Sequence, residues 1–144
     1  MRELPDNNFD EARRWMASVE GDLRAMRALQ RDSLSPGRIV CFLAHLAVEK
    51  ALKAVLIDTG IPFQKTHNLV HLHEMCVGAG RLTGLDVQPL GALNPWGIDG
   101  RYAEDDPRDA DRSFAQRMTH AAENVVAMVR AELEEGGRRP GRDG

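Results

Sequence analysis

Apolar residues recur at three- and four-residue steps along most of the chain, which is the spacing of helices that bury one face. No stretch shows the strict alternation of apolar and polar residues that is typical of a half-buried strand. The pattern is clearest in the middle of the chain and in its last third. The sequence therefore predicts an all-α protein.

Turn-forming residues frame the middle helix. Ser35 is the expected N-cap, and Pro36 suits the first helical position, where a missing N–H costs nothing. Gly60 suits a left-handed C-terminal stop, and Pro62 prevents the helix from continuing. Lys50 interrupts the apolar stripe of this helix. The predicted inward-facing positions are Ile39, Phe42, Leu43, Leu46, Ala47, Ala54 and Ile57.

Two further helices flank the middle one in sequence. The first is expected to begin near Phe9, because residues 6–8 offer N-caps. A shorter helix should begin at about His67 or Asn68 and run to Val77, where a pair of glycines follows.

The segment after the third helix is the least regular part of the chain. Glycines and prolines in residues 81–100 permit at most a short helix around residues 89–93, with Trp96 inserted into the core. The last long helix is expected to begin at Asp106 as N-cap, with Pro107 at the first position and further acidic residues in the first turn.

One domain accounts for the whole pattern, because 144 residues can bury a sufficient core without disulfides or metal. The predicted fold is a roughly antiparallel bundle of four main helices plus a short fifth. Residues 1–8 are expected to form a flexible arm, residues 9–135 the bundle, and residues 136–144 a disordered tail. The first and last helices are long enough to supply faces for a homodimer as well as a core.

The composition is that of an ordinary globular protein, with 42% apolar and 28% charged residues and a net charge of −3. This charge argues against broad nonspecific coating of nucleic acid, although it permits a local basic groove. No apolar run approaches the roughly 20 residues needed to cross a bilayer, and the polar N-terminus is no signal peptide. Cys41 and Cys76 lie within helical patterns, so reduced thiols and a cytoplasmic location are expected.

Chemically capable side chains gather on one flank of the middle helix. His45, Glu49 and Lys53 follow each other at four-residue steps, and Lys50 is adjacent to Glu49. A structural interpretation pairs Glu49 with Lys53 and lets Lys50 extend its charge to solvent from an apolar face. A functional interpretation assigns the two ammonium groups to a bound phosphate.

Three segments in a fixed order carry a resemblance to a known family. AVEKALKAVL on the middle helix is followed by a Gly-Ile-Pro loop, then by KTHNL, and later by the pair Arg101-Tyr102. This order resembles the HEPN family (higher eukaryotes and prokaryotes nucleotide-binding domain), over about residues 9–133. The resemblance implies a helical bundle that is usually dimeric. It also implies pairing with a minimal nucleotidyltransferase in a toxin–antitoxin or nucleotide-binding system.

From this resemblance we expect a nucleotide- or RNA-binding module. The candidate binding residues are Lys50, Lys53, His67, Arg101 and Tyr102, with Glu49 as part of a structural network. The structural alternative for the same residues is that His67 caps the third helix and that the Arg-Tyr pair fastens its loop to Glu49.

A sharper alternative is a metal-independent ribonuclease toxin. Nucleases of the wider superfamily carry an arginine followed, after four to six residues, by a histidine on a late helix. Arg38 and His45 match this spacing formally and would act as the catalytic pair, although they lie on the second helix. No histidine follows Arg101 at the required distance.

Other chemistries receive less support from the sequence. His67, His71 and Glu74 fall on one helix face, but they match no established metal motif, and neither a metal nor a cofactor is predicted. No phosphate-binding glycine loop occurs, and neither cysteine has the surroundings of a nucleophile. The remaining alternative is a non-enzymatic dimeric scaffold whose polar residues only stabilise the bundle.

Overall fold

Three long helices form the frame of the molecule in the computed structural model, which describes residues 7–98 and 109–137. They are α1 (Asn8–Arg31), α2 (Gly37–Thr59) and α5 (Arg112–Gly137). All regular structure within the described residues is helical. The predicted all-α bundle is therefore confirmed.

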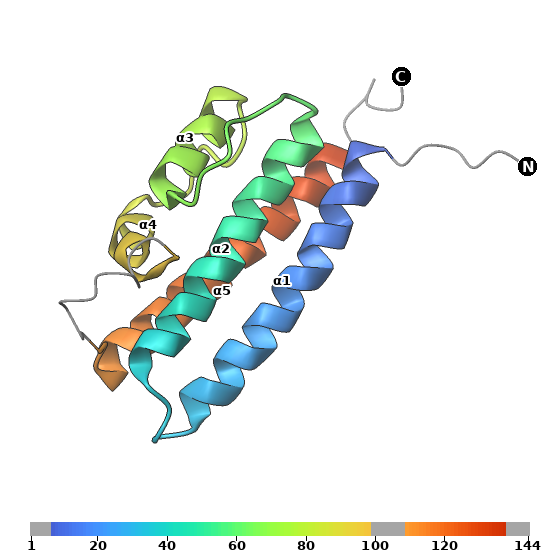
Figure 1. Ribbon diagram of the computed structural model, residues 1–144. Helices are drawn as coiled ribbons and strands as arrows, with labels where there is room; N and C mark the ends of the chain where they lie inside the picture. Colours follow the sequence, from blue (N-terminus) through green and yellow to red (C-terminus); the bar gives the residue numbers. More distant parts are fainter. Residues whose placement is uncertain (1–6, 99–108, 138–144) are drawn as a thin grey trace, which may run out of the picture.

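The remaining helices are short and lie along one side of α2 (Figure 1). They are α3 (Leu69–Gly78), α4 (Gln88–Leu93) and a single 3-10 turn, η1 (Asn94–Trp96). The short helix predicted around residues 89–93 is thus present as α4. Trp96 is half-buried, and its ring centroid lies 5.6 Å from that of Phe114 on α5.

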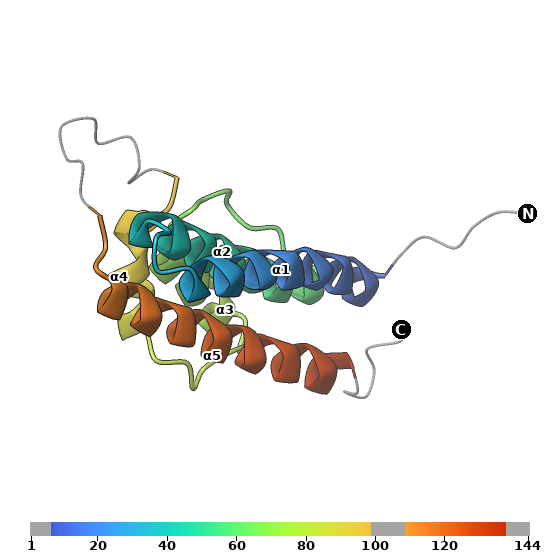
Figure 2. The same cartoon turned by 90° about the horizontal axis from the view of Figure 1, so that it is seen from below.

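The long helices do not all alternate in direction. α1 is antiparallel to both α2 and α5, whereas α5 runs in the same direction as α2 (Figures 1 and 2). A parallel neighbour requires the chain to travel back along the bundle between the two helices. The segment that contains α3 and α4 makes this return.

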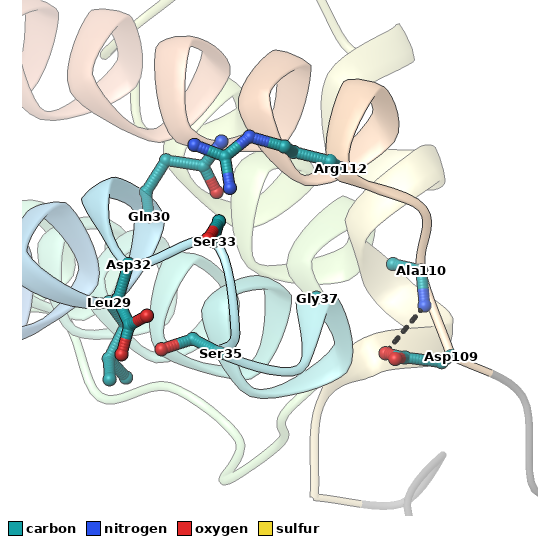
Figure 3. A pocket seen from close by; sticks show the side chains of 9 residues that line it. All are labelled: Leu29, Gln30, Asp32, Ser33, Ser35, Gly37, Asp109, Ala110 and Arg112. Carbon is teal, nitrogen blue, oxygen red and sulfur yellow. Dashed lines mark hydrogen bonds between the residues drawn. The ribbon is translucent and has the colours of Figure 1, made fainter.

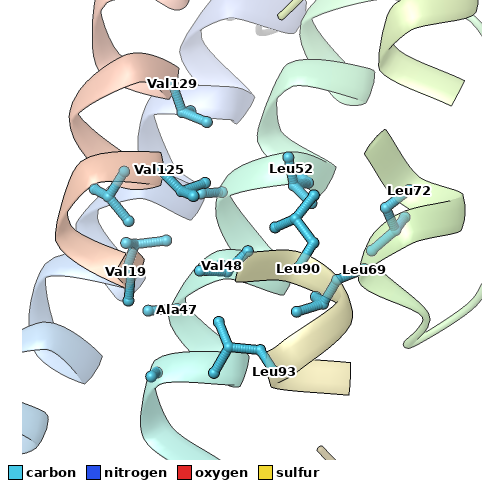
Figure 4. Packing of buried hydrophobic residues seen from close by; sticks show 14 of the residues in the cluster. Val19, Ala47, Val48, Leu52, Leu69, Leu72, Leu90, Leu93, Val125 and Val129 are labelled. Atoms are coloured by element: carbon cyan, nitrogen blue, oxygen red, sulfur yellow. The ribbon is translucent and has the colours of Figure 1, made fainter. Parts of the chain in front are cut away.

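α2 is the central helix, and it is buried on nearly all sides rather than along one stripe. It packs against α1, α5 and the α3–η1 segment, so its buried surface extends around most of the helix. Ile39, which was predicted to face inward, is 38% exposed, because Val40 and Cys41 take the inner positions of that turn. The side chains drawn in Figure 4 show α2 contributing to the core from several directions: Ala47, Val48 and Leu52 lie among Val19, Leu69, Leu72, Leu90, Leu93, Val125 and Val129.

Some helix ends follow their predicted chemistry. The side chain of Asn7 caps α1, and Asn68 caps α3 by accepting a hydrogen bond from the amide of His71 at 3.1 Å. Gly60 ends α2 in the left-handed conformation, with φ of 71°. The ends at Asn7 and Gly60 confirm the sequence-based expectations, whereas Asn68 caps α3 in place of His67, which was the structural alternative.

The start of α2 differs from its prediction. Pro36 occupies the cap position and has no side chain that can accept a hydrogen bond, so Ser35 does not cap the helix. Asp109, from the segment before α5, supplies the cap instead, and its Oδ1 accepts a hydrogen bond from the amide of Arg38 at 2.7 Å. A β-carbon at Gly37 would collide with the carbonyl oxygen of Ala110, so glycine permits this close approach.

The bounds of α5 also differ from the prediction. Asp106 lies outside the described residues, but residues 109–111 are not helical and the helix begins at Arg112. Asp111 is the observed cap, because its Oδ1 accepts a hydrogen bond from the amide of Phe114 at 2.7 Å. The helix continues to Gly137, beyond the expected end of the bundle at residue 135.

Ion pairs join the outer faces of α1 and α5. Arg27 contacts Glu123 at 2.6 Å, and Arg130 pairs with Glu20. All four side chains are at least one-third exposed, so each pair contributes little to stability.

In the described ranges, no helix combines the length and the apolar character that a membrane span requires.

Candidate binding site beside Glu49

Four polar side chains meet on the flank of α2 that faces the α2–α3 loop. Glu49 is only 4% exposed, and its Oε2 accepts a hydrogen bond from Lys53 Nζ at 2.8 Å. The same oxygen lies 2.9 Å from Nδ1 of His67, while Oε1 lies 3.6 Å from Nδ1 of His45. We call these four residues the Glu49 cluster.

The charge of Glu49 is stabilised by its neighbours. Burial on its own would raise the pKa of the Glu49 carboxyl, but hydrogen bonds and positive charge from Lys53 and His67 outweigh it and lower the pKa. Glu49 is therefore ionised at neutral pH. An ionised carboxylate accepts only, so the His67 Nδ1 atom must carry the hydrogen that points to it.

Local chain geometry explains how the cluster forms. Steps of four residues place His45, Glu49 and Lys53 above one another on a helix. After Gly60 the chain must return about 16 Å along α2 to reach the level of Glu49, at 1.5 Å per helical residue. The non-helical residues 61–67 can span about 23 Å when extended, so His67 reaches Glu49 without strain.

Two asparagines join α3 to the 3-10 turn next to the cluster. Asn94 Oδ1 accepts a hydrogen bond from the amide of Leu69 at 2.8 Å, and Asn94 Nδ2 donates to Asn68 Oδ1 at 3.0 Å. Asn68 Oδ1 also caps α3. This pair fixes the position of the residue before the cap, His67.

A pocket of about 410 Å³ opens between the Glu49 cluster and the asparagine pair. Its size falls within the range of small-molecule sites in proteins. Two imidazoles and two amides form its polar side, and apolar side chains form the rest. The described lining residues are His45, His67, Asn68, Asn94, Pro95, Gly97 and Ile98.

Gly97 shapes the inner end of this pocket. A β-carbon at this position would collide with the ring of His45, which is only 2% exposed. The backbone can therefore lie directly against the imidazole only because residue 97 is glycine. No local sequence pattern indicated this contact, because the two residues belong to different elements.

The structure brings together some of the predicted binding residues and separates others. Lys53 and His67 both lie in the Glu49 cluster. Lys50 points to α1 instead, where its Nζ lies 2.9 Å from Asp22 Oδ2 and donates to Ser18 Oγ at 2.9 Å. Arg101 and Tyr102 were predicted to join the site but lie outside the described residues.

The predicted catalytic pair spans two turns of α2. Arg38 is exposed at the start of the helix, whereas His45 is buried beside Glu49. Seven residues correspond to a rise of about 10 Å, so the two side chains leave the helix about 10 Å apart along its axis. The assignment of this pair as catalytic remains a prediction.

A second, smaller pocket of about 200 Å³ lies where the C-terminal end of α1, the start of α2 and the start of α5 meet (Figure 3). Its walls are mostly polar and of mixed charge, and they include Asp32, Asp109 and Arg112. The two carboxylates are already engaged: Asp32 Oδ1 accepts from the amide of Leu34 at 2.9 Å, and Asp109 caps α2. We attribute this polar lining to turn formation and helix capping.

A buried ionic cluster that the sequence analysis missed joins α2, α5 and the segment after α3. Arg81 is 3% exposed and donates to Asp58 Oδ2 at 2.8 Å, and its Nε lies 3.1 Å from Glu132 Oε2. The neighbouring Leu82 has a left-handed backbone, with φ of 53°, and its amide donates to Glu132 Oε1 at 2.8 Å. We call Arg81, Asp58 and Glu132 the Arg81 cluster.

The histidines and cysteines outside the Glu49 cluster form no metal site within the described residues. His71 Nδ1 lies 3.7 Å from exposed Glu74, and within the described chain no group of histidine, cysteine or acidic residues has the arrangement of a metal site. Both thiols are free and buried, and burial raises the pKa of Cys41 and of Cys76 to about 12. Such thiols are poor nucleophiles at neutral pH.

Comparisons with known proteins agree on one family. The model of the HEPN domain family matches residues 12–133. A solved structure described as that of ST0689, an archaeal HEPN homologue, superimposes with a TM-score of 0.60 at 20% sequence identity, covering 85% of this chain and 97% of that one. No curated protein matches the chain at a significant level. Because the family model covers most of the chain, the protein belongs to the HEPN family.

Proposed function

We propose that the protein is a nucleotide- or RNA-binding HEPN module, and that the pocket beside Glu49 is its binding site. The observation that carries this proposal is that one buried carboxylate orients His67, which lines an open pocket, and also binds Lys53. Family membership supports the ligand class. Lys50 lies on the α1 side of α2 and is not part of this proposed site.

The pocket has the mixed character that a nucleotide requires. Pro95 and Ile98 provide apolar contact, while the amides of Asn68 and Asn94 and the ring of His67 provide hydrogen-bonding groups. His67 has 42% of its side chain exposed, so a ligand can reach it without opening the bundle. Arg101 and Tyr102 remain proposed contacts from the adjoining segment.

The test compares two histidines of equal exposure. Ribonucleoside 5′-monophosphates and a short single-stranded RNA are titrated by calorimetry against the wild type, His67→Ala and His71→Ala. Each of the two side chains is 42% exposed, but only His67 contacts Glu49. We expect His67→Ala to weaken binding about tenfold and His71→Ala to leave it unchanged, with melting temperatures of both variants close to the wild type.

Binding that is equal in both variants would place the ligand elsewhere on the protein. No binding to any of the probes would favour the scaffold interpretation, in which the Glu49 cluster only stabilises the bundle.

A metal-independent ribonuclease is the second candidate, because His45 lies in the same pocket next to an ionised carboxylate. In this proposal His45 exchanges a proton with the 2′-hydroxyl, and Arg38 stabilises the phosphate. The separation of the two along α2 requires Arg38 to act on a neighbouring phosphate of the RNA or in a second protomer. Metal-stripped protein is incubated with labelled RNA, beside His45→Ala and Arg38→Ala; this proposal requires cleavage that both substitutions abolish.

We further propose that the protein forms a homodimer and is the partner of a minimal nucleotidyltransferase in a toxin–antitoxin pair. Membership of the HEPN family supports this assignment. Light scattering coupled to size exclusion measures the oligomeric state. Co-purification with the product of an adjacent nucleotidyltransferase gene tests the pairing, and a monomer that does not retain this product would contradict it.

A further inference from the structure

The backbone fixes the orientation of both amide groups at the pocket. Asn94 Oδ1 accepts from the amide of Leu69, and Asn68 Oδ1 accepts from the amide of His71. A backbone amide can only donate, so each side-chain oxygen must face it and each NH2 group must face the other way. Asn68 Oδ1 accepts a second hydrogen bond, from Asn94 Nδ2.

As a consequence, the NH2 group of Asn68 is available to a ligand. Asn68 lines the pocket and is exposed, and its Nδ2 makes no hydrogen bond to any described residue. Asn94 Nδ2 has a second hydrogen beyond the one donated to Asn68. The asparagine pair therefore presents donors, not acceptors, to the pocket.

His67 adds a further nitrogen to the pocket. Its Nδ1 carries the hydrogen that faces Glu49, so Nε2 is the ring nitrogen that can contact a ligand. Nε2 makes no hydrogen bond within the described part of the chain, and both His67 and Asn68 line the pocket. The pocket thus offers this ring nitrogen together with the amide donors.

A phosphate group matches this pattern poorly. A phosphate is negatively charged, and the ionised Glu49 carboxylate lies directly behind the His67 ring. Among the described residues that line the pocket there is no lysine or arginine, and the Lys53 ammonium is engaged by Glu49. The polar edge of a nucleobase does match, because a donor and an acceptor are adjacent on it, and its faces can lie against Pro95 and Ile98.

We propose that the pocket binds the neutral base of an unpaired nucleotide and leaves the phosphate outside, an inference that rests on the nucleotide-binding function proposed above. The hydrogen-bonding edge of the base contacts Asn68 Nδ2 and His67 Nε2. A base that is paired in a duplex has this edge occupied, so the substrate class is a free nucleoside or nucleotide, or single-stranded RNA.

Calorimetric titration of the full chain with the four ribonucleosides, their 5′-monophosphates and inorganic phosphate separates base binding from phosphate binding. We expect at least one nucleoside to bind with a dissociation constant within about fivefold of its monophosphate, because the phosphate contributes little. Inorganic phosphate should not compete. Monophosphates that bind while nucleosides do not, with phosphate competing, would overturn the base assignment and leave the proposed function intact. Absence of binding to every nucleoside, monophosphate and single-stranded RNA would overturn both.

Substitutions at the cap position test the contact itself. Asn68→Ser and Asn68→Asp both retain a side-chain oxygen that caps α3, and both lack the NH2 donors. Each should weaken binding of the nucleoside about tenfold while the melting temperature changes little. Asn124→Asp, on an exposed face of α5, is the matched control and should bind like the wild type. Undiminished nucleoside binding by folded Asn68→Ser would overturn the proposal.

Discussion

The Arg81 cluster and the Glu49 cluster both hold buried carboxylates on α2, but they differ in what surrounds them. In the Arg81 cluster the side chains of Arg81, Asp58 and Glu132 are 4%, 0% and 12% exposed, and the cluster borders neither of the two pockets described above. In the Glu49 cluster, His67 is 42% exposed and borders a pocket. The first arrangement joins three segments of the fold, whereas the second also places His45 and His67 at the wall of a pocket.

This difference predicts different consequences for substitutions in the two clusters. Removing one partner of a closed ion cluster leaves uncompensated charge inside the protein, so its main effect is on stability. Removing an exposed side chain from a cluster that borders a pocket changes the groups available to a ligand in that pocket. Such a substitution has little effect on stability. Substitutions in the two clusters should therefore separate stability from binding.

The largest effect on stability is expected for Arg81→Ala. The substitution leaves Asp58 and Glu132 buried without their cation, which costs about 3–5 kcal/mol in the free energy of unfolding. Urea denaturation followed by circular dichroism measures this loss. Arg24→Ala, on an exposed position of α1, is the control and should change stability by less than about 0.5 kcal/mol. A loss below about 1 kcal/mol for Arg81→Ala would show that the cluster is not a structural centre.

A smaller effect is expected for Gly97→Ala, at the base of the pocket. The added methyl group collides with the His45 ring and should cost about 1–3 kcal/mol. Gly91→Ala on α4 is a matched control, because a β-carbon there meets no atom within 4 Å, and helix propensity should make this variant slightly more stable. Equal stability of the two alanine variants would contradict the close packing of His45.

Gly97→Ala also tests how the two clusters differ in their effect on nucleoside binding. Displacing His45 alters the wall of the pocket, so Gly97→Ala should also weaken nucleoside binding, whereas Gly91→Ala should not. Arg81→Ala, measured at a temperature where it remains folded, should bind like the wild type because its cluster does not border the pocket. Calorimetry on the three variants provides this comparison.

The smallest effect concerns the pH dependence of stability. The pKa of Glu49 is lowered in the folded protein from an ordinary value of 4.5, so its contribution to stability is present above pH 4.5 and is lost as the pH falls through the folded pKa. In Glu49→Gln the free energy of unfolding should decrease less steeply below pH 4.5 than in the wild type. Urea titrations at several pH values measure the slope, with exposed Glu134→Gln as control. A slope in Glu49→Gln equal to that of the wild type would contradict the assignment.

Local features of the fold were predictable because they depend on neighbouring residues. The left-handed stop at Gly60 and the cap at Asn7 follow from the chemistry of single residues, and the spacing of Glu49 and Lys53 places them on successive turns. Family resemblance correctly indicated the helical bundle. These conclusions required no knowledge of how the helices pack.

Features that depend on packing were not predictable in the same way. Asp109 caps α2 from a distant segment, so the local candidate Ser35 was the wrong choice. The partners of Arg81 lie on two other helices, and no local pattern marks them. Lys50 was predicted to bind the ligand together with Lys53, but its side chain points to α1, where it pairs with Asp22.

The parallel course of α2 and α5 affects the order in which the molecule can assemble. Joining α1 to α2 closes only residues 32–36, whereas joining α5 to α2 closes residues 60–111, which costs about 2 kcal/mol more in loop entropy. We therefore expect the α1–α2 hairpin to form first and α5 to dock last. The contact between Trp96 and Phe114 connects the return segment to α5, so a ligand that stabilises this segment should also slow the detachment of α5.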